Sequence, residues 1–113
     1  MHCVQRSFGA KFHEKCPLFE GEKVVSKGRL ERVDSYSAFG TPPETTSMLD
    51  ELKLDGITEL YCVGLAYDYT VGLTAIDGAK LGFKTYVLTD ATRAVAEETE
   101  ETMSQRLEDA GVI

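Results

Sequence analysis

The chain has 113 residues, of which 42% are apolar and 27% are charged. This length and balance fit one small globular domain and exclude collagen-like, low-complexity and wholly disordered chains. The net charge of −7 argues against a nucleic-acid partner, and no run of about 20 apolar residues predicts a membrane span. The first residues lack the apolar core of a signal peptide, so the cytoplasm is the expected location.

The charges are unevenly distributed along the chain. Residues 1–32 contain seven Lys/Arg and four Asp/Glu, whereas residues 33–113 contain five and fifteen. The basic third is too short and too mixed in sign to indicate an arm that binds a polyanion. The three cysteines are odd in number and form no CxxC pair, which argues against a disulfide scaffold.

Hydrophobic periodicity predicts alternating strands and helices from residue 23 onward. Residues 23–26 resemble a short strand. Thr41-Pro42-Pro43-Glu44 has the form of a capping box, with Pro42 as the first residue of a helix that ends near Gly56. The elements that follow are a strand buried on both faces at 59–65, a helix at 70–82, a strand at 83–89, a helix at 97–110 and the start of another strand at 112–113.

Strands that alternate with helices over short connections predict right-handed crossovers and a parallel sheet. The whole chain, residues 1–113, is therefore expected to form a single α/β domain. About three full strands are visible, which is few for a stable core, so we expect the domain to be partial at both ends. A homo-oligomer or another partner chain is a candidate to cover the strand edges left unpaired.

Ligands of parallel α/β sheets bind at the carboxyl ends of the strands. Two such ends stand out, Ser26-Lys27-Gly28 and the tight turn from Leu65 to Thr70. The turn is expected to direct backbone N–H groups outward and to put residue 70 at a helix N-terminus, where negative charge is stabilised. This arrangement suits a nucleophile with an oxyanion hole, although on spacing alone a plain connecting turn is the commoner explanation.

Several motifs together resemble the nicotinamidase/pyrazinamidase branch of the isochorismatase-like cysteine hydrolases. They cover nearly the whole chain. Taken together they are specific for this family, although no single motif is. The motifs are His2-Cys3-Val4-Gln5 with Gly9-Ala10-Lys11-Phe12-His13, Lys27-Gly28 with Asp34-Ser35-Tyr36-Ser37-Ala38-Phe39, Val63-Gly64-Leu65-Ala66-Tyr67-Asp68-Tyr69-Thr70-Val71, Leu81-Gly82-Phe83, and Thr89-Asp90-Ala91-Thr92-Arg93-Ala94-Val95. An unrelated flavodoxin-like or nucleotide-binding module ranks lower, because the chain has no GxGxxG or Walker A motif.

The resemblance implies a three-layer α/β/α fold around a parallel sheet, and hydrolysis of nicotinamide to nicotinate and ammonia in NAD salvage. Enzymes of this kind use an Asp–Lys–Cys triad, in which the cysteine attacks the amide carbonyl and backbone N–H groups hold the oxyanion. A divalent metal (zinc, iron or manganese) holds the pyridine nitrogen or its ordered waters. Nicotinamide, pyrazinamide and isochorismatase-type substrates share this scaffold, so the choice of small-molecule substrate stays open; no nucleic-acid or membrane partner is expected.

The family's catalytic residues carry over by position. Lys27 matches the triad lysine, Thr70 stands at the nucleophile position, and Ala66 with residue 70 matches the oxyanion hole. The resemblance also implies a non-proline cis peptide bond between Leu65 and Ala66. Without the motif, Lys27 would be interpreted as an exposed lysine at a strand end.

The family's binding residues carry over less completely. Tyr36 matches a pocket aromatic suited to stacking on a pyridine ring, with core packing as its alternative, and Tyr69 is assigned to the same pocket. His2 matches a metal-ligand histidine, with a disordered terminal residue as its alternative. The family's other metal ligands belong to an Asp-x-His segment that this sequence lacks.

Two departures from the family predict weak or absent activity. Position 70 is threonine rather than cysteine, and a hydroxyl stays protonated where a thiol ionises. The triad aspartate belongs to a first strand that would precede Met1, whereas Asp68 is expected to brace the turn or cap the helix that follows it. Cys62 lies within a strand and is expected to pack as a small apolar residue. The alternative function is a non-catalytic homologue or fragment that binds a small aromatic ligand or a partner subunit.

Overall fold

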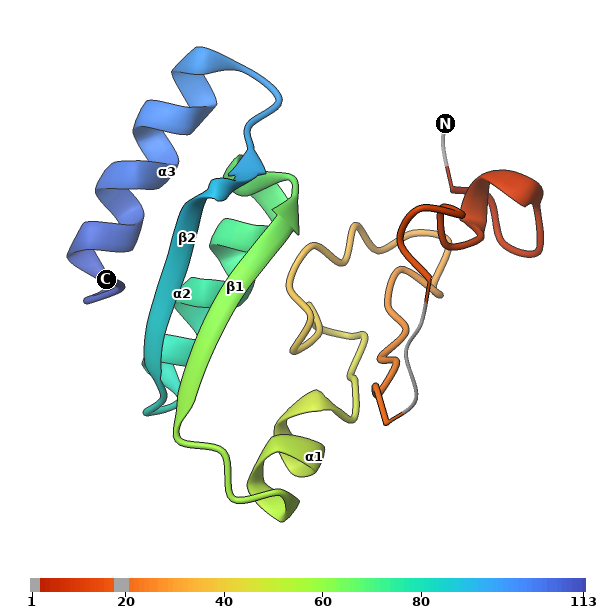
Figure 1. The fold of residues 1–113 in the computed structure, drawn as a ribbon, viewed down its shortest axis with the longest axis horizontal. Coiled ribbons are helices and arrows are strands. Elements are labelled where there is room, and N and C mark those ends of the chain that lie inside the picture. The colour runs from red at the N-terminus through yellow and green to blue at the C-terminus, as the bar shows by residue number, and fades with distance from the viewer. Residues whose placement is uncertain (1–2, 18–20) are drawn as a thin grey trace.

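The computed structural model describes residues 3–17 and 21–113. Its elements are the 3₁₀ turn η1 (Phe8–Ala10), α1 (Met48–Leu54), β1 (Glu59–Leu65), the π-helical turn η2 (Tyr67–Val71), α2 (Gly72–Lys80), β2 (Lys84–Arg93) and α3 (Glu97–Asp109) (Figure 1). The predicted order of helix, strand, helix, strand and helix is confirmed. The predicted strand at 23–26 is wrong, because the sheet of the described residues contains only β1 and β2 and offers this segment no pairing partner.

β1 and β2 are adjacent and parallel, as predicted. Their pairing runs in register as far as Cys62 of β1 and Val87 of β2. There residues 88–91 of β2 bulge outward opposite the single residue Val63 of β1, and pairing then resumes. β2 is longer than predicted because it continues past this bulge.

The last residues of the chain lie along the other edge of β2. The Ile113 N–H donates to the Thr85 carbonyl at 3.0 Å, and the Val87 N–H donates to the Ile113 carbonyl at 3.1 Å. Ile113 therefore bonds to residues 85 and 87 of β2, through its N–H and its carbonyl respectively. This is the hydrogen-bond pattern of two parallel strands. The pairing expected of a strand that begins at 112–113 is therefore present.

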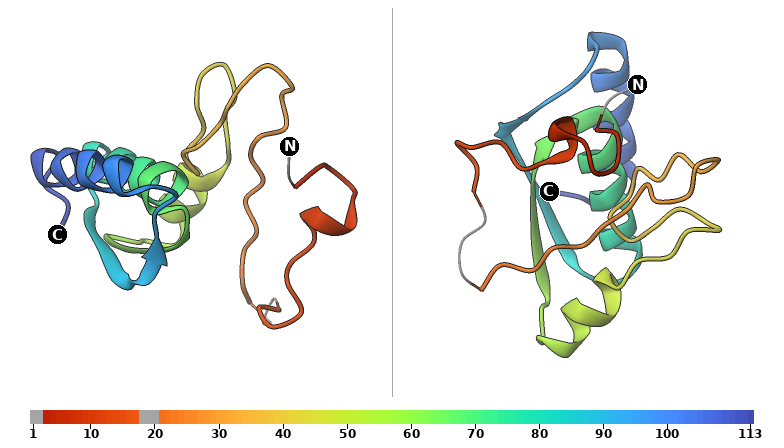
Figure 2. Two further views of the ribbon diagram at one scale, coloured as in Figure 1. Left: turned by 90° about the horizontal axis from the view of Figure 1, so that it is seen from above. Right: turned by 90° about the vertical axis from the view of Figure 1, so that its right-hand side faces the viewer.

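The helices α2 and α3 lie on the same face of the sheet (Figure 2). A buried cluster joins them, with Cys62 and Val87 of the two strands packed against it; its members are Tyr67, Ala75, Ile76, Met103 and Leu107. A Cβ on Gly78 of α2 would lie only 2.8 Å from Leu60 Cδ1 of β1. The close contact between helix and sheet that the small residues of 70–82 predict is therefore confirmed.

The opposite face of β1 is exposed. Tyr61, Val63 and Leu65 are 59%, 52% and 76% exposed, so the prediction that 59–65 is buried on both faces is wrong. Only the alternate residues of the strand meet the helices, as the period of two in a strand requires. On the exposed face the Tyr61 and Tyr86 rings stack with centroids 4.8 Å apart.

Gly72, the first residue of α2, lies where η2 and α3 meet this helix. A Cβ on Gly72 would lie 2.6 Å from both Met103 Cγ and the Tyr67 carbonyl oxygen. Gly72→Ala is therefore expected to lower the free energy of unfolding by about 1–3 kcal/mol, although alanine is ordinarily the better helix former. Urea unfolding measures this change.

Gly9→Ala is the matched control for that measurement, because the nearest atom to its added Cβ would be Ser7 Oγ at 3.8 Å. An unfolding midpoint for Gly72→Ala equal to that of the wild type would contradict the close packing between η2, α2 and α3.

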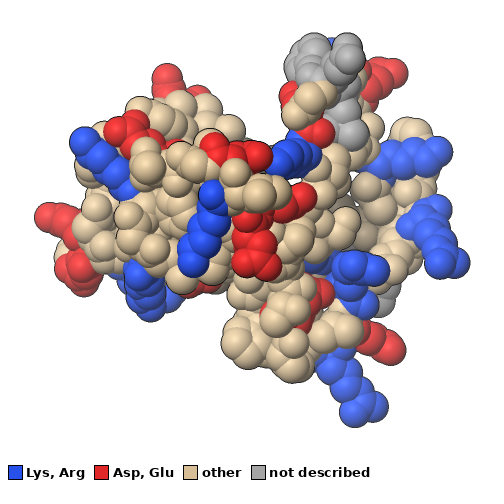
Figure 3. Space-filling view, turned by 90° about the horizontal axis from the view of Figure 1, so that it is seen from below, with Lys and Arg blue, Asp and Glu red and all other residues tan. Residues whose placement is uncertain are grey.

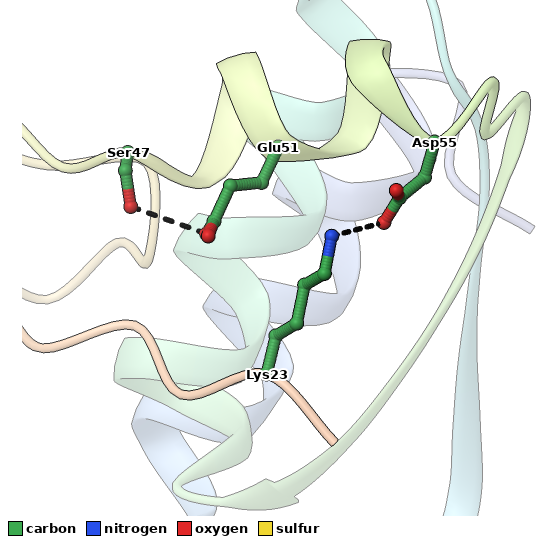
Figure 4. A network of polar contacts seen from close by, with 4 residues as sticks. All are labelled: Lys23, Ser47, Glu51 and Asp55. Atoms are coloured by element: carbon green, nitrogen blue, oxygen red, sulfur yellow. Dashed lines mark hydrogen bonds and ion pairs between the residues drawn. The ribbon is translucent and has the colours of Figure 1, made fainter. Parts of the chain in front are cut away.

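α1 begins at Met48 and not at Pro42. The proline that follows Pro42 disfavours helical backbone at that residue, so the capping box does not start a helix. The Ser47 hydroxyl instead donates to the Glu51 carboxylate at 3.1 Å, just ahead of the first turn (Figure 4). The end of the helix, at Leu54, agrees with the prediction.

Apart from η1, the described residues before α1 run as irregular loops beside the helices and the sheet (Figures 1 and 2). On the face shown in Figure 3, basic side chains gather over this segment, while both signs mix over the rest. Lys23 pairs with Asp55 at 2.6 Å, and this pair is half exposed, so it fixes the segment only weakly (Figure 4). Within the described residues, no helix has the length and apolar character to cross a membrane.

Candidate active site

The loop of residues 35–46 is fixed on α2 by side-chain hydrogen bonds. The Ala38 N–H donates to the Thr74 hydroxyl of α2 at 2.9 Å, and the Thr46 hydroxyl donates to the Ala38 carbonyl at 2.6 Å. The first bond holds the loop against the helix, and the second closes the loop on itself. The buried polar residues of the loop are Ser35, Ser37 and Glu44. Binding and catalytic residues often lie on loops that a rigid element positions, so this loop is a candidate for such a role.

Glu44 uses its carboxylate to hold a distant part of the chain. Its two oxygens accept the Gly28 N–H at 2.9 Å and the Arg29 N–H at 2.7 Å. The Ser35 hydroxyl, which faces the carboxylate but lacks the geometry of a formed hydrogen bond, and these two amides lower the pKa of Glu44 to about 2. The capping-box role predicted for Glu44 is therefore wrong, because its side chain turns away from α1.

The lowered pKa of Glu44 predicts a loss of stability in acid. The group contributes stability at every pH above its ordinary pKa of 4.5, and this contribution is lost as the pH falls toward about 2. The destabilisation caused by Glu44→Gln should therefore be largest near neutral pH and should shrink below pH 4.5. Urea unfolding across this pH range tests it.

Glu31→Gln, which changes an exposed glutamate, serves as the control. A difference between Glu44→Gln and the wild type that stays constant from neutral to acid pH would contradict the lowered pKa.

Lys27 lies directly before the two amides that Glu44 holds. Its ammonium group donates to the Ser35 carbonyl at 2.9 Å, and the residue is partly buried. Tyr36 follows Ser35, and its ring lies 5.3 Å from the Tyr69 ring at a tilt of 43°. The structure thus brings Tyr36 and Tyr69 together and binds the Lys27 ammonium group to the carbonyl of the residue before Tyr36.

Between β1 and α2 the chain makes the tight turn that the sequence predicts. The Leu65–Ala66 peptide bond is cis, as the resemblance implies. The Ala66 carbonyl accepts the N–H groups of Tyr69 at 3.2 Å and Val71 at 3.0 Å, which closes η2. Thr70 is partly buried in this turn, next to the N-terminus of α2, where negative charge is favoured.

Asp68 ties the turn to the start of α3. It is 5% exposed, and its carboxylate accepts the Val95 N–H at 3.0 Å, the Ala96 N–H at 3.3 Å and the Thr99 hydroxyl. Burial raises its pKa, but the Thr99 hydroxyl and the two amides outweigh burial, so the pKa lies below its ordinary value. The expectation that Asp68 braces the turn is confirmed. The alternative, that it caps the helix following the turn, is wrong, because its carboxylate binds the amides just before α3 and the Thr99 hydroxyl instead.

A family model described as the Isochorismatase domain matches residues 1–113, the whole chain. The chain belongs to the isochorismatase family. A nicotinamidase of Acinetobacter baylyi is 40% identical to it over 96 residues, which are 83% of this chain and 45% of that protein. The chain spans about half the length of the curated relatives it matches.

Solved structures of isochorismatase-like proteins share its fold. PnC1 from L. infantum in complex with nicotinate superposes with a TM-score of 0.93 at 36% identity, over 99% of this chain and 57% of its own. The pyrazinamidase of Pyrococcus horikoshii in complex with zinc gives a TM-score of 0.87 at 33% identity, over 99% of this chain and 59% of its own. The predicted α/β fold with a parallel sheet and the predicted family are both confirmed.

Cys62 is the cysteine nearest in sequence to Thr70 in this isochorismatase-family chain. It is partly buried in β1 and packs against the core cluster, and burial raises the pKa of its thiol. A thiol of that kind is mostly protonated near neutral pH and is a poor nucleophile. The prediction that Cys62 packs as an apolar residue is confirmed.

The metal ligand that the resemblance implies, His2, lies outside the described residues. Among residues 3–17 and 21–113, no group of three or more His, Cys, Asp or Glu side chains is arranged to hold a metal ion. The described residues therefore do not fit the divalent metal of the family, and no catalytic step below passes through it.

The sequence motifs assigned Glu44 only to a capping box and did not point to Thr74. The partners of the Glu44 carboxylate lie 16 and 15 residues earlier in the chain, and the Thr74 hydroxyl binds an amide 36 residues earlier. Neither separation matches a helical or strand period, so no local pattern could have predicted these contacts. The one available signal is the density of Ser and Thr in residues 35–46, where Glu44 is the only charged residue.

Proposed function

We propose that this isochorismatase-family protein binds nicotinamide-like carboxamides beside the turn between β1 and α2, and that its hydrolytic activity is weak or absent. Its similarity to nicotinamidases supports the substrate class. The observation that carries the proposal is the contact between the Tyr36 and Tyr69 rings. It joins the loop that binds Lys27 to the turn that contains Thr70.

Each residue has a distinct part in the proposed site. Tyr36 and Tyr69 offer aromatic faces to a pyridine ring. Lys27 supplies a positive charge close to this pair, which suits a carboxamide oxygen or a carboxylate product. Ala66 and Thr70 supply backbone N–H groups for an oxyanion, and the Thr70 hydroxyl stands where the family has its nucleophilic thiol.

Hydrolysis at this site would need Thr70 as the nucleophile. Its oxygen would bond to the carbonyl carbon, the C–N bond would break, and the hydroxyl proton would leave with ammonia. Water would then cleave the resulting ester, release the carboxylate and restore the hydroxyl. A hydroxyl ionises far less readily than a thiol, and Lys27 in its charged form accepts no proton, so the first step is expected to be slow.

The direct test combines nicotinate binding with ammonia release. Titration of the protein with nicotinate, followed by NMR, is expected to shift resonances of Lys27, Tyr36 and Tyr69 in a saturable way. Ammonia release from nicotinamide, with divalent metal supplied, is expected to stay close to the uncatalysed rate. Absence of binding would refute the proposal, and turnover typical of enzymes, about 1 per second or faster, would refute its second half.

A non-catalytic role is the second candidate, and Thr70 favours it. A homologue that binds a small aromatic ligand needs the ring pair and the positive charge but not the thiol. Binding without turnover in both the wild type and Thr70→Cys would select this role. The cytoplasmic location, the divalent metal and a homo-oligomeric state stay predictions from the sequence.

A further inference from the structure

Glu44 is a buried carboxylate in a loop, and burial of a charge is costly unless it is paired or hydrogen-bonded. The residue is 6% exposed, although it belongs to no helix or strand. Each of its oxygens accepts one backbone N–H, at 2.9 Å from Gly28 and at 2.7 Å from Arg29. The burial of this carboxylate is therefore offset by contacts with one short segment of the chain.

The backbone of that segment is shaped to meet the carboxylate. Gly28 has a φ of 69°, a conformation that other residues rarely adopt, and a Cβ there would meet no atom within 4 Å. The glycine is thus required for the direction of the chain and not for space. Its left-handed backbone points two successive N–H groups toward one acceptor, as in the backbone concavities that bind anions.

Few other contacts fix the chain around Lys27. Residues 21–34 form no helix or strand, and the Lys23–Asp55 ion pair is half exposed. The Lys27 ammonium group itself bonds to the Ser35 carbonyl, which belongs to the same 35–46 loop as Glu44. The Gln5 side-chain amide adds a longer bond of 3.5 Å to the Arg29 carbonyl. The shorter contacts near Lys27 both run to the 35–46 loop, one through the Lys27 side chain and one through the amides that follow it.

We infer that Glu44 is a positioning residue for Lys27, because it anchors the backbone directly after Lys27 to the loop that carries Tyr36. This inference rests on the proposed function, in which Lys27 contributes to ligand binding. Glu44 touches neither the ligand nor Thr70 in this scheme. Glu44 affects ligand binding by fixing the position of the Lys27 ammonium group.

Amide hydrogen exchange and NMR of the free protein test the positioning without any ligand. In Glu44→Gln, exchange at the Gly28 and Arg29 amides is expected to accelerate by about tenfold or more, and the Lys27 ε-CH₂ resonance is expected to shift. Amides of α2 and α3 should exchange as in the wild type. Lys23→Met, which breaks the exposed ion pair in the same segment, should leave the Lys27 resonance unchanged.

A double-mutant cycle on nicotinate affinity separates positioning from a merely structural role. Glu44→Gln and Lys27→Met are each expected to weaken nicotinate binding by about tenfold, and the double variant should be no weaker than Lys27→Met alone. Additive losses would overturn the inference, as would an unchanged Lys27 resonance in Glu44→Gln. If the wild type binds no nicotinate, the proposed function fails, and the exchange and resonance measurements still decide whether Glu44 positions Lys27.

Discussion

Thr70→Cys is expected to raise the rate of ammonia release from nicotinamide by about 100-fold or more over the wild type. The residue lies in η2, next to the N-terminus of α2, and in the proposed site Lys27 lies close by. A helix N-terminus and a nearby cation both favour a thiolate over a thiol. The substitution would thus supply an ionisable nucleophile where the wild type has a hydroxyl.

The environment of residue 70 can be measured separately from turnover. The pH dependence of alkylation by iodoacetamide should give the introduced thiol a pKa below the ordinary value of about 8.5. Cys62 provides the internal contrast, because burial raises the pKa of its thiol. Thr70→Ser is the matched control, since it keeps a hydroxyl and should show no gain in ammonia release.

The rate of ammonia release and the pKa of the introduced thiol together show which groups limit the rate of hydrolysis. A lowered thiol pKa without turnover would place the deficit in groups other than residue 70. An introduced thiol with an ordinary pKa and no ammonia release would contradict the proposed electrostatics of the turn.

Asp68→Ala is expected to lower the free energy of unfolding by about 2–3 kcal/mol. The side chain is 5% exposed and holds the amides of the two residues just before α3 together with the Thr99 hydroxyl. Its removal leaves the N–H groups of Val95 and Ala96 without their acceptor and detaches η2 from α3. Urea unfolding followed by far-UV circular dichroism measures the loss.

Two further variants rank the contributions to this contact. Thr99→Val removes one donor and should cost less than Asp68→Ala, whereas Asp50→Asn changes an exposed aspartate of α1 and should cost almost nothing. Equal stability of Asp68→Ala and Asp50→Asn would contradict the conclusion that the Asp68 hydrogen bonds hold η2 to the start of α3. Because these hydrogen bonds of Asp68 fix the conformation of the turn, Asp68→Ala should also weaken nicotinate binding.

The second half of the chain could be predicted from its sequence because its signals are local. The strand at 59–65 matches β1, and the helices at 70–82 and 97–110 match the η2–α2 and α3 regions within a few residues. Hydrophobic periodicity, small residues and terminal glycines act within one element, so they can be recognised without knowledge of its neighbours.

The first half resisted prediction because its structure depends on distant contacts. The apolar residues at 23–26 fit a strand, but a strand exists only where a neighbour pairs with it. Glu44 fits a capping box, but its carboxylate binds amides of residues 28 and 29 instead. The turn after β1 could be predicted from its motif, whereas the contacts of Glu44 with the backbone after Lys27 could not.

A crystal structure of the protein with nicotinate tests most directly whether Lys27 and the turn at Thr70 share one pocket. We predict that the pyridine ring lies against Tyr36 and Tyr69, with its carboxylate between the Lys27 ammonium group and the backbone N–H groups of the turn. A ligand bound elsewhere, or a Lys27 ammonium group that faces a different side of the molecule from Thr70, would contradict the shared pocket and the chemistry assigned to it.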